Sequence, residues 1–183
     1  MGMQYKELSG NLIEFIHAQK MFFVATADVD GKVNVSPKGL DSFHIINKKH
    51  VLWLNLTGSG NETATHIQNH PRMTIMFNAL EGNPLILRLY GQAKVIHIND
   101  TDWKKWYSCF DDFIGARQLF LMSIDLVQTS CGMAVPLYDY KQQRNALIDS
   151  AIRKGEDGVK KYWQDKNALS LDGKETNIIK LNL

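Results

Sequence analysis

The feature of this sequence that most constrains its fold is a series of short segments in which apolar and polar residues alternate, joined by turn signals. Alternation with a period of two is typical of strands that bury one face. Asp30-Gly31 is a strong hairpin signal, and polar residues at 47–50 and 81–84 mark two further reversals. We therefore expect strands at 21–28, 33–38, 42–46, 51–57, 73–78, 85–95 and 119–127.

Helices are expected around this series, and none serves as a crossover between parallel strands. Strands in hairpin succession favour an antiparallel barrel, so the predicted class is mainly β with flanking helices (α+β). The chain is expected to form one domain over residues 1–183, with a barrel core at about 21–136 and a C-terminal helical extension at about 137–183. The helices are predicted at 9–19, 62–70, 100–113, 141–154 and 157–166, with breaks at Gly155 and Gly158.

Composition narrows the functional classes. The formal net charge of the 183 residues is only +2, which argues against a large nucleic-acid surface. No apolar run has membrane-spanning length, and no signal-peptide segment opens the sequence. Cys109 and Cys131 are too few for a disulfide framework or a zinc site, so we expect no metal and a reduced, cytoplasmic protein.

The segment 57–66, TGSGNETATH, is the strongest candidate for a binding site. It follows the predicted strand 51–57 and opens a helix that must end by Pro71. Ser59 and Glu62 have the spacing of a capping box, and Gly58 and Gly60 permit close approach of a ligand. The unpaired N–H groups at a helix start favour an anion such as phosphate. Alternatively, the segment is only a capped connection.

Three further positions are ambiguous from the sequence alone. On the strand 33–38 the face that ends in Lys38 is polar, so it meets either solvent or a site. Arg88 lies between apolar neighbours in mid-strand and needs a partner, either a carboxylate or a ligand. Trp53 lies opposite the leucines 52, 54 and 56, and we expect a ligand or a partner subunit to cover its ring.

Four segments in fixed order resemble the pyridoxamine 5′-phosphate oxidase-related flavoproteins, which have an FMN-binding split β-barrel. The resemblance extends over about 22–136, with a weaker echo at 166–173. The segments are FFVATADVDGKVNVSPKG, LWLNLTGSGNETATHIQNHPRMTIMF, LILRLYG and SCGMAVP.

The resemblance implies FMN bound at the interface of a homodimer. Lys38 matches the lysine that ends the family's first binding strand, Thr57 matches a threonine of its second, and 61–63 match its phosphate-binding turn. The segment 130–136 would approach the flavin from the partner chain, and Arg88 could donate to the flavin ring. The implied FMN-binding residues are Val35, Ser36, Pro37, Lys38, Leu56, Thr57, Asn61, Glu62, Thr63, Arg88, Cys131 and Gly132.

Two departures from the oxidase pattern bear on activity. The oxidase has an Arg-Lys pair in the turn where this chain has Glu62 and Thr63, and we expect Glu62 to fold back into the capping box. The oxidase's tail carries arginine and tryptophan, whereas this chain has no arginine after Arg153 and no tryptophan after Trp163. We therefore expect an FMN-dependent oxidoreductase with a small-molecule substrate or reductant, and not an efficient pyridoxamine phosphate oxidase. The alternatives are a non-enzymatic flavin sensor or carrier, or a split barrel that binds deazaflavin or haem.

Overall fold

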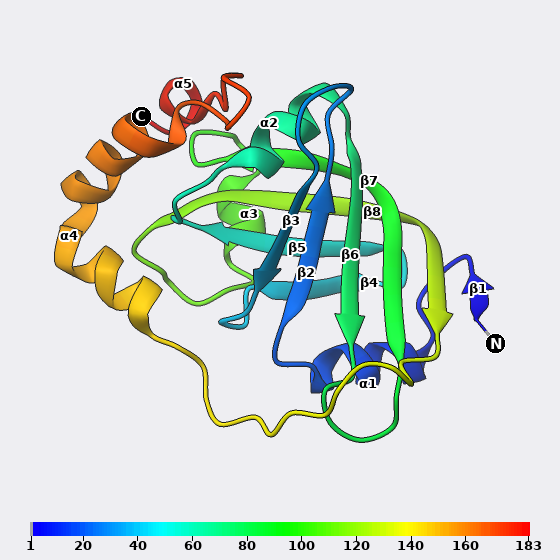
Figure 1. Ribbon diagram of the computed structural model, residues 1–183. Coiled ribbons are helices and arrows are strands. Elements are labelled where there is room, and N and C mark those ends of the chain that lie inside the picture. Colours follow the sequence, from blue (N-terminus) through cyan, green and yellow to red (C-terminus); the bar gives the residue numbers. More distant parts are fainter. Residues whose placement is uncertain (1) are drawn as a thin grey trace.

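The computed structural model describes residues 2–183 and shows an antiparallel split β-barrel with flanking helices (Figure 1). Its sheet has eight strands in the order β3-β2-β6-β7-β8-β5-β4, and β1 pairs with β8. The antiparallel hairpins expected from the sequence are confirmed. The strands are β1 (Met3–Tyr5), β2 (Phe22–Thr26), β3 (Asn34–Lys38), β4 (Phe43–Asn47), β5 (His50–Leu56), β6 (Arg72–Asn78), β7 (Ile86–His97) and β8 (Ala116–Ser130).

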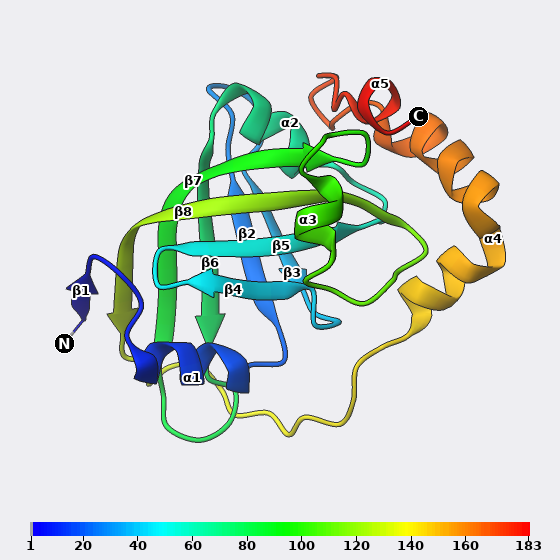
Figure 2. The same cartoon turned by 180° about the vertical axis from the view of Figure 1, so that it is seen from behind.

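The helices lie outside the barrel (Figures 1 and 2). The helix expected at 100–113 is much shorter, because the chain leaves it after Tyr107 and the Phe113 N–H donates to the Tyr107 hydroxyl at 2.8 Å. The predicted break at Gly155 is confirmed (φ 64°), but the helix continues through Gly158. The helices are α1 (Gly10–Ala18), α2 (Glu62–Asn69), α3 (Trp103–Tyr107), α4 (Ala146–Tyr162), the π-helical turn η1 (Trp163–Asn167) and α5 (Ile178–Asn182).

The long strands β7 and β8 bend the sheet into a barrel. They pair over almost their full length, with a register shift between Tyr90 and Gly91. A Cβ atom at Gly91 would lie 1.9 Å from the Ser123 carbonyl oxygen, so only glycine fits at this crossing. The two sheet edges, β3 and β4, do not pair, and this opening is the split in the barrel.

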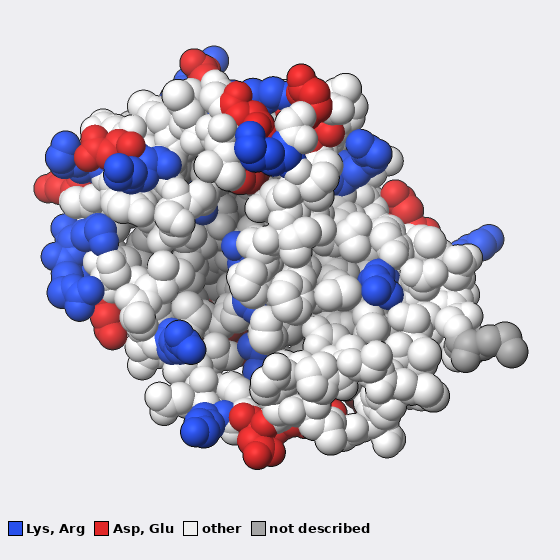
Figure 3. Space-filling view, in the orientation of Figure 1, with Lys and Arg blue, Asp and Glu red and all other residues white. Residues whose placement is uncertain are grey.

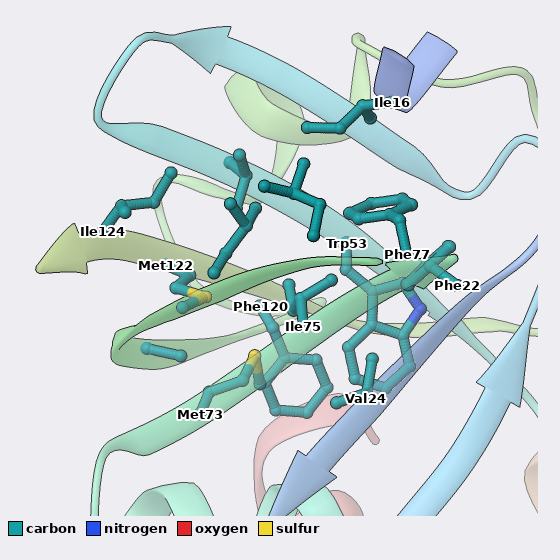
Figure 4. Packing of buried hydrophobic residues seen from close by; sticks show 14 of the residues in the cluster. Ile16, Phe22, Val24, Trp53, Met73, Ile75, Phe77, Phe120, Met122 and Ile124 are labelled. Atoms are coloured by element: carbon teal, nitrogen blue, oxygen red, sulfur yellow. The ribbon is translucent and has the colours of Figure 1, made fainter. Parts of the chain in front are cut away.

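Strand β5 is buried on both of its faces. Trp53 points into the barrel, is 2% exposed and stacks on Phe120 with ring centroids 4.7 Å apart (Figure 4). Leu52 and Leu54 point outward and pack with Trp103 of α3 in a second cluster. The prediction that Trp53 needs a ligand or a partner to cover it is therefore wrong. A strand inside the sheet order, covered by a helix on its outer face, buries both sets of side chains.

The C-terminal helices pack beside the barrel around their own apolar cluster. Ala151, Val159, Trp163 and Ile178 form this cluster, which also contacts Ile98 at the end of β7. Figures 1 and 2 show α4 standing next to the open side of the barrel, reached by a long segment that passes beneath it. Among the described residues, no helix combines the length and apolar character needed to cross a bilayer.

Candidate anion-binding site

A cavity of about 580 Å³ lies in the split of the barrel. Strand β3 forms one wall, β5 and the turn at 58–61 form another, and the start of α2 closes one end. In the space-filling view, Lys and Arg side chains line the hollow between the barrel and the C-terminal helices (Figure 3). The lining residues that bear on its chemistry are Asn34, Ser36, Lys38, Asn55, Asn61, Glu62, Thr63 and Arg117.

Lys38 reaches this cavity because β3 alternates. Asn34, Ser36 and Lys38 lie on the half-buried face of the strand, whereas Val35 on the other face is 62% exposed. The Lys38 ammonium lies 5.1 Å from the centre of the Trp53 ring. Burial, and secondarily the charge of Arg117, lowers the pKa of Lys38 to about 8.

Arg117 supplies a second, deeper positive charge. Only 3% of it is exposed, and its guanidinium donates to the Gly60 carbonyl at 2.6 Å and to the amide oxygens of Asn167 (2.8 Å) and Asn55 (3.3 Å). Burial lowers the pKa of Arg117 to about 9. All these acceptors are neutral, and no ion pair within residues 2–183 includes Lys38 or Arg117.

The sequence analysis missed Arg117. The last strand was expected to begin at Leu119, whereas β8 begins at Ala116, so Arg117 fell outside the predicted strand. The signal that identified Arg88, an arginine beside a run of apolar strand residues, was also present here. What the sequence could not show is the proximity of Arg117 to the turn at 58–61.

Buried donors without a partner accompany these cations. Asn61 Nδ2 and Arg117 Nε are buried at the cavity, and neither has a hydrogen-bond acceptor among the described residues. Asn55 Nδ2 donates to Asn61 Oδ1 at 3.3 Å, which leaves the Asn61 amide donors free. A buried donor without an acceptor costs about 1–3 kcal/mol, so an anionic acceptor fits this donor set.

The start of α2 differs from the expected capping box. Asn61 is the N-cap residue, and its side chain makes no capping hydrogen bond. The Glu62 carboxylate turns toward the C-terminal segment and accepts the Leu171 N–H at 3.0 and 3.1 Å. The predicted return of Glu62 to the Ser59 backbone is therefore wrong, because a donor from the C-terminal segment competes for it. The first N–H groups of α2 remain available to an anion.

The structure divides the predicted site residues into two groups. Ser36, Pro37, Lys38, Leu56, Asn61, Glu62 and Thr63 line the cavity.

Thr57 and Val35 lie outside the cavity lining. The Thr57 hydroxyl donates to the Gly115 carbonyl and accepts from Trp163 Nε1, both at 2.7 Å. Arg88 lies on the outer face of β7, away from this cavity, and within its own chain it donates to the Ser130 hydroxyl at 3.0 Å rather than to a carboxylate. Cys131 and Gly132 follow Ser130, and this end of β8 lies across the barrel from α4 (Figures 1 and 2).

Comparison with known proteins points to one family. Residues 8–131 match the family described as Pyridoxamine 5′-phosphate oxidase. The chain is 33% identical over 193 residues to the pyridoxamine 5′-phosphate oxidase family protein ustO of Aspergillus flavus, covering 94% of this chain and 77% of that protein.

Two solved structures share the fold. HupZ from Group A Streptococcus has a TM-score of 0.52 at 19% identity, covering 65% of this chain and 91% of HupZ. HutZ of Vibrio cholerae, described as a haem storage protein, has a TM-score of 0.51 at 19% identity, covering 69% of this chain and 97% of HutZ.

Proposed function

Because the chain belongs to the pyridoxamine 5′-phosphate oxidase family, we propose that it is a flavoprotein that binds FMN through the cavity in the split of its barrel. The observation that carries this proposal is the pair of cations, half-buried Lys38 and buried Arg117, beside donors that have no acceptor among residues 2–183. A phosphate dianion supplies the missing charge and the missing acceptors together.

Each part of the cavity has a distinct role in holding the phosphate. Lys38 acts as a mobile point charge, and Arg117, fixed by its bonds to the turn, keeps a positive potential beneath the site. Asn61 Nδ2 and the first N–H groups of α2 donate hydrogen bonds. The cavity volume of about 580 Å³ lies in the range of cofactor pockets. When bound, FMN supplies the redox chemistry, and the protein orients it.

We further propose that a second copy of the chain completes the flavin site. Arg88, Ser130, Cys131 and Gly132 gather away from the cavity of their own chain, which is the arrangement expected if they serve the partner's flavin. The outer face of β2, β6 and β7 carries half-buried Phe23, Met76 and Tyr90, and no helix of residues 2–183 covers it (Figure 1). A two-fold pair of chains would bury these residues.

Haem is a weaker candidate for this cavity. HutZ is described as a haem storage protein, but likeness at 19% identity extends only to the fold. The lining residues include no histidine, cysteine, methionine or tyrosine from the described part of the chain that could act as an axial iron ligand. The cations and donors of the cavity suit a phosphate group instead.

The proposed reaction class is the oxidation or reduction of a small molecule. Efficient oxidation of pyridoxamine 5′-phosphate is not proposed, because that substrate carries a phosphate of its own. Lys38 and Arg117 already serve the FMN phosphate, and the tail after Asn167 has no arginine to bind the substrate phosphate. A flavin carrier or sensor would use the same site without turnover. Free Cys109 and Cys131 are in keeping with a cytoplasmic location.

The test of this function is the ligand itself. We expect the purified protein to carry, or to take up, about one FMN per chain, seen in the visible spectrum and identified by mass spectrometry after release. The spectrum also separates flavin from deazaflavin and haem. Calorimetry should show tighter binding of FMN than of riboflavin, which lacks the phosphate. A protein that binds neither flavin, or that binds both equally, contradicts the proposal.

A further inference from the structure

The anion cavity is built partly by residues far beyond the family match. The matched region ends at residue 131, yet η1 and the turn that follows it contact both the cation Arg117 and the carboxylate Glu62. Each contact controls a charge beside the proposed phosphate site. The C-terminal extension is therefore in direct contact with the groups that determine the charge of the cavity.

Asn167 links the buried arginine to the turn before α2. Its side chain is fully buried, its Oδ1 accepts from Arg117 Nη1 at 2.8 Å, and its Nδ2 donates to the carbonyls of Gly58 (3.0 Å) and Ser59 (3.4 Å). Thr176 holds the Asn167 backbone by donating its hydroxyl to the Asn167 carbonyl at 2.6 Å. One amide thus fixes the guanidinium and the turn relative to each other.

The Leu171 N–H controls Glu62. It donates to both carboxylate oxygens, and it lies in a turn in which the Gly173 N–H donates to the Ser170 carbonyl at 3.0 Å. Without this donor the Glu62 carboxylate, which lines the cavity, would be free to approach the phosphate and repel it.

Ion pairs to the β2–β3 hairpin hold this turn in place. Asp172 accepts from the Lys32 ammonium at 2.6 Å and from the Lys32 N–H at 2.8 Å. Lys174 pairs with Asp28 at 2.9 Å and with Asp30. Asp28 is itself buried, and bonds from Asn69 and Lys174 keep the pKa of its carboxyl far below the ordinary value. The turn is therefore anchored at two positions directly after Leu171.

We infer that the segment 167–174 positions the charges of the phosphate site: Asn167 holds Arg117 in place, and the Leu171 N–H keeps Glu62 away from the anion. This inference rests on the proposed function. Both residues are positioning residues that discriminate FMN from riboflavin without touching the flavin ring.

Leu171→Pro tests the second contact, since it removes the N–H. Leu171 is the second residue of its turn, a position that accepts proline, so the turn is retained. We expect the dissociation constant of FMN to rise about tenfold, the factor that one pKa unit of differential interaction represents, with little change for riboflavin. Leu171→Ala keeps the N–H but shortens a residue of the cavity lining, so as the matched control it should keep the wild-type ratio of FMN to riboflavin affinity.

Glu62→Gln provides the rescue. In the Leu171→Pro background it should restore FMN affinity to within about threefold of the wild type, because the repelling charge is gone. Failure of the rescue, or an equal loss of FMN and riboflavin affinity, would mean that Leu171 has only a structural role and would overturn this part of the inference.

Asn167→Ala tests the first contact, with exposed Asn145→Ala as its control. We expect a loss of FMN affinity of about tenfold or more, and a smaller loss for riboflavin. If Asn167→Ala does not fold, Asn167→Asp is the second variant. Its carboxylate still accepts from Arg117 but neutralises the charge of the guanidinium, so this variant should lose the preference for FMN over riboflavin. Unchanged preference in the folded variants refutes the inference while leaving the proposed function intact. If the wild type itself lacks the preference, the proposed function falls.

Discussion

At the residue scale, the candidate site depends on burying charges that have no carboxylate partner. Lys38→Met should weaken FMN binding about ten- to a hundredfold, because a hydrogen bond to a charged group contributes about 1.5–3 kcal/mol. Riboflavin should lose much less. The apo protein should keep or gain thermal stability, since an unpaired buried cation is removed. Calorimetry measures both ligands, and exposed Lys94→Met is the control. Equal losses for FMN and riboflavin would place Lys38 away from the phosphate.

The lowered pKa of Lys38 gives the same residue a pH signature. With a pKa of about 8, against an ordinary 10.5, the lysine of the apo protein becomes neutral above pH 8. Binding of the phosphate dianion then requires uptake of a proton, so FMN affinity should fall by up to about tenfold per pH unit above pH 8. The stability of the apo protein should rise with pH between 8 and 10.5, where only the unfolded chain binds the proton. Calorimetry from about pH 7 to 10 checks the first effect. In Lys38→Met the fall in affinity should be smaller and should begin nearer pH 9, the pKa of Arg117.

At the element scale, the barrel depends on the close crossing of β7 and β8. Gly91→Ala would place a methyl group against the Ser123 carbonyl. This carbonyl belongs to the backbone of β8, which cannot move aside as a flexible side chain can. We expect a loss of about 2–3 kcal/mol in the free energy of unfolding, measured with urea. Gly10→Ala at the start of α1, where nothing lies within 4 Å of the new Cβ, should change the free energy of unfolding by less than about 1 kcal/mol. Similar values for the two variants would show that the crossing is not tight.

At the scale of the whole molecule, the proposed site needs two chains. Light scattering should show a dimer at micromolar concentration. Tyr90→Asp on the uncovered outer sheet face should favour the monomer, because a charge at a paired apolar face is costly to bury. The monomer should also bind the flavin ring more weakly, since Arg88 and the residues after Ser130 would no longer come from a partner. A wild-type monomer with full flavin occupancy would contradict this arrangement.

The sequence by itself determined the features that depend on near neighbours. Alternation and turn residues predicted the hairpins, and the segment 57–66 was identified as a candidate site from its place before a helix. Lys38 was ambiguous from its strand position and was assigned to the site by the resemblance to the family. Those signals are local, because strand pleat and helix capping involve residues only a few positions apart.

Only the tertiary structure decided which distant residues meet. Trp53 lies in the core because the sheet curls around its face of β5 while α3 covers the opposite face, which alternation within one strand does not reveal. Arg117 lies 59 residues after Gly58, which it contacts at the cavity. Leu171 lies 109 residues after its contact Glu62. The reason is physical: burying a charge requires partners from several elements at once, and their positions exist only after the sheet has closed.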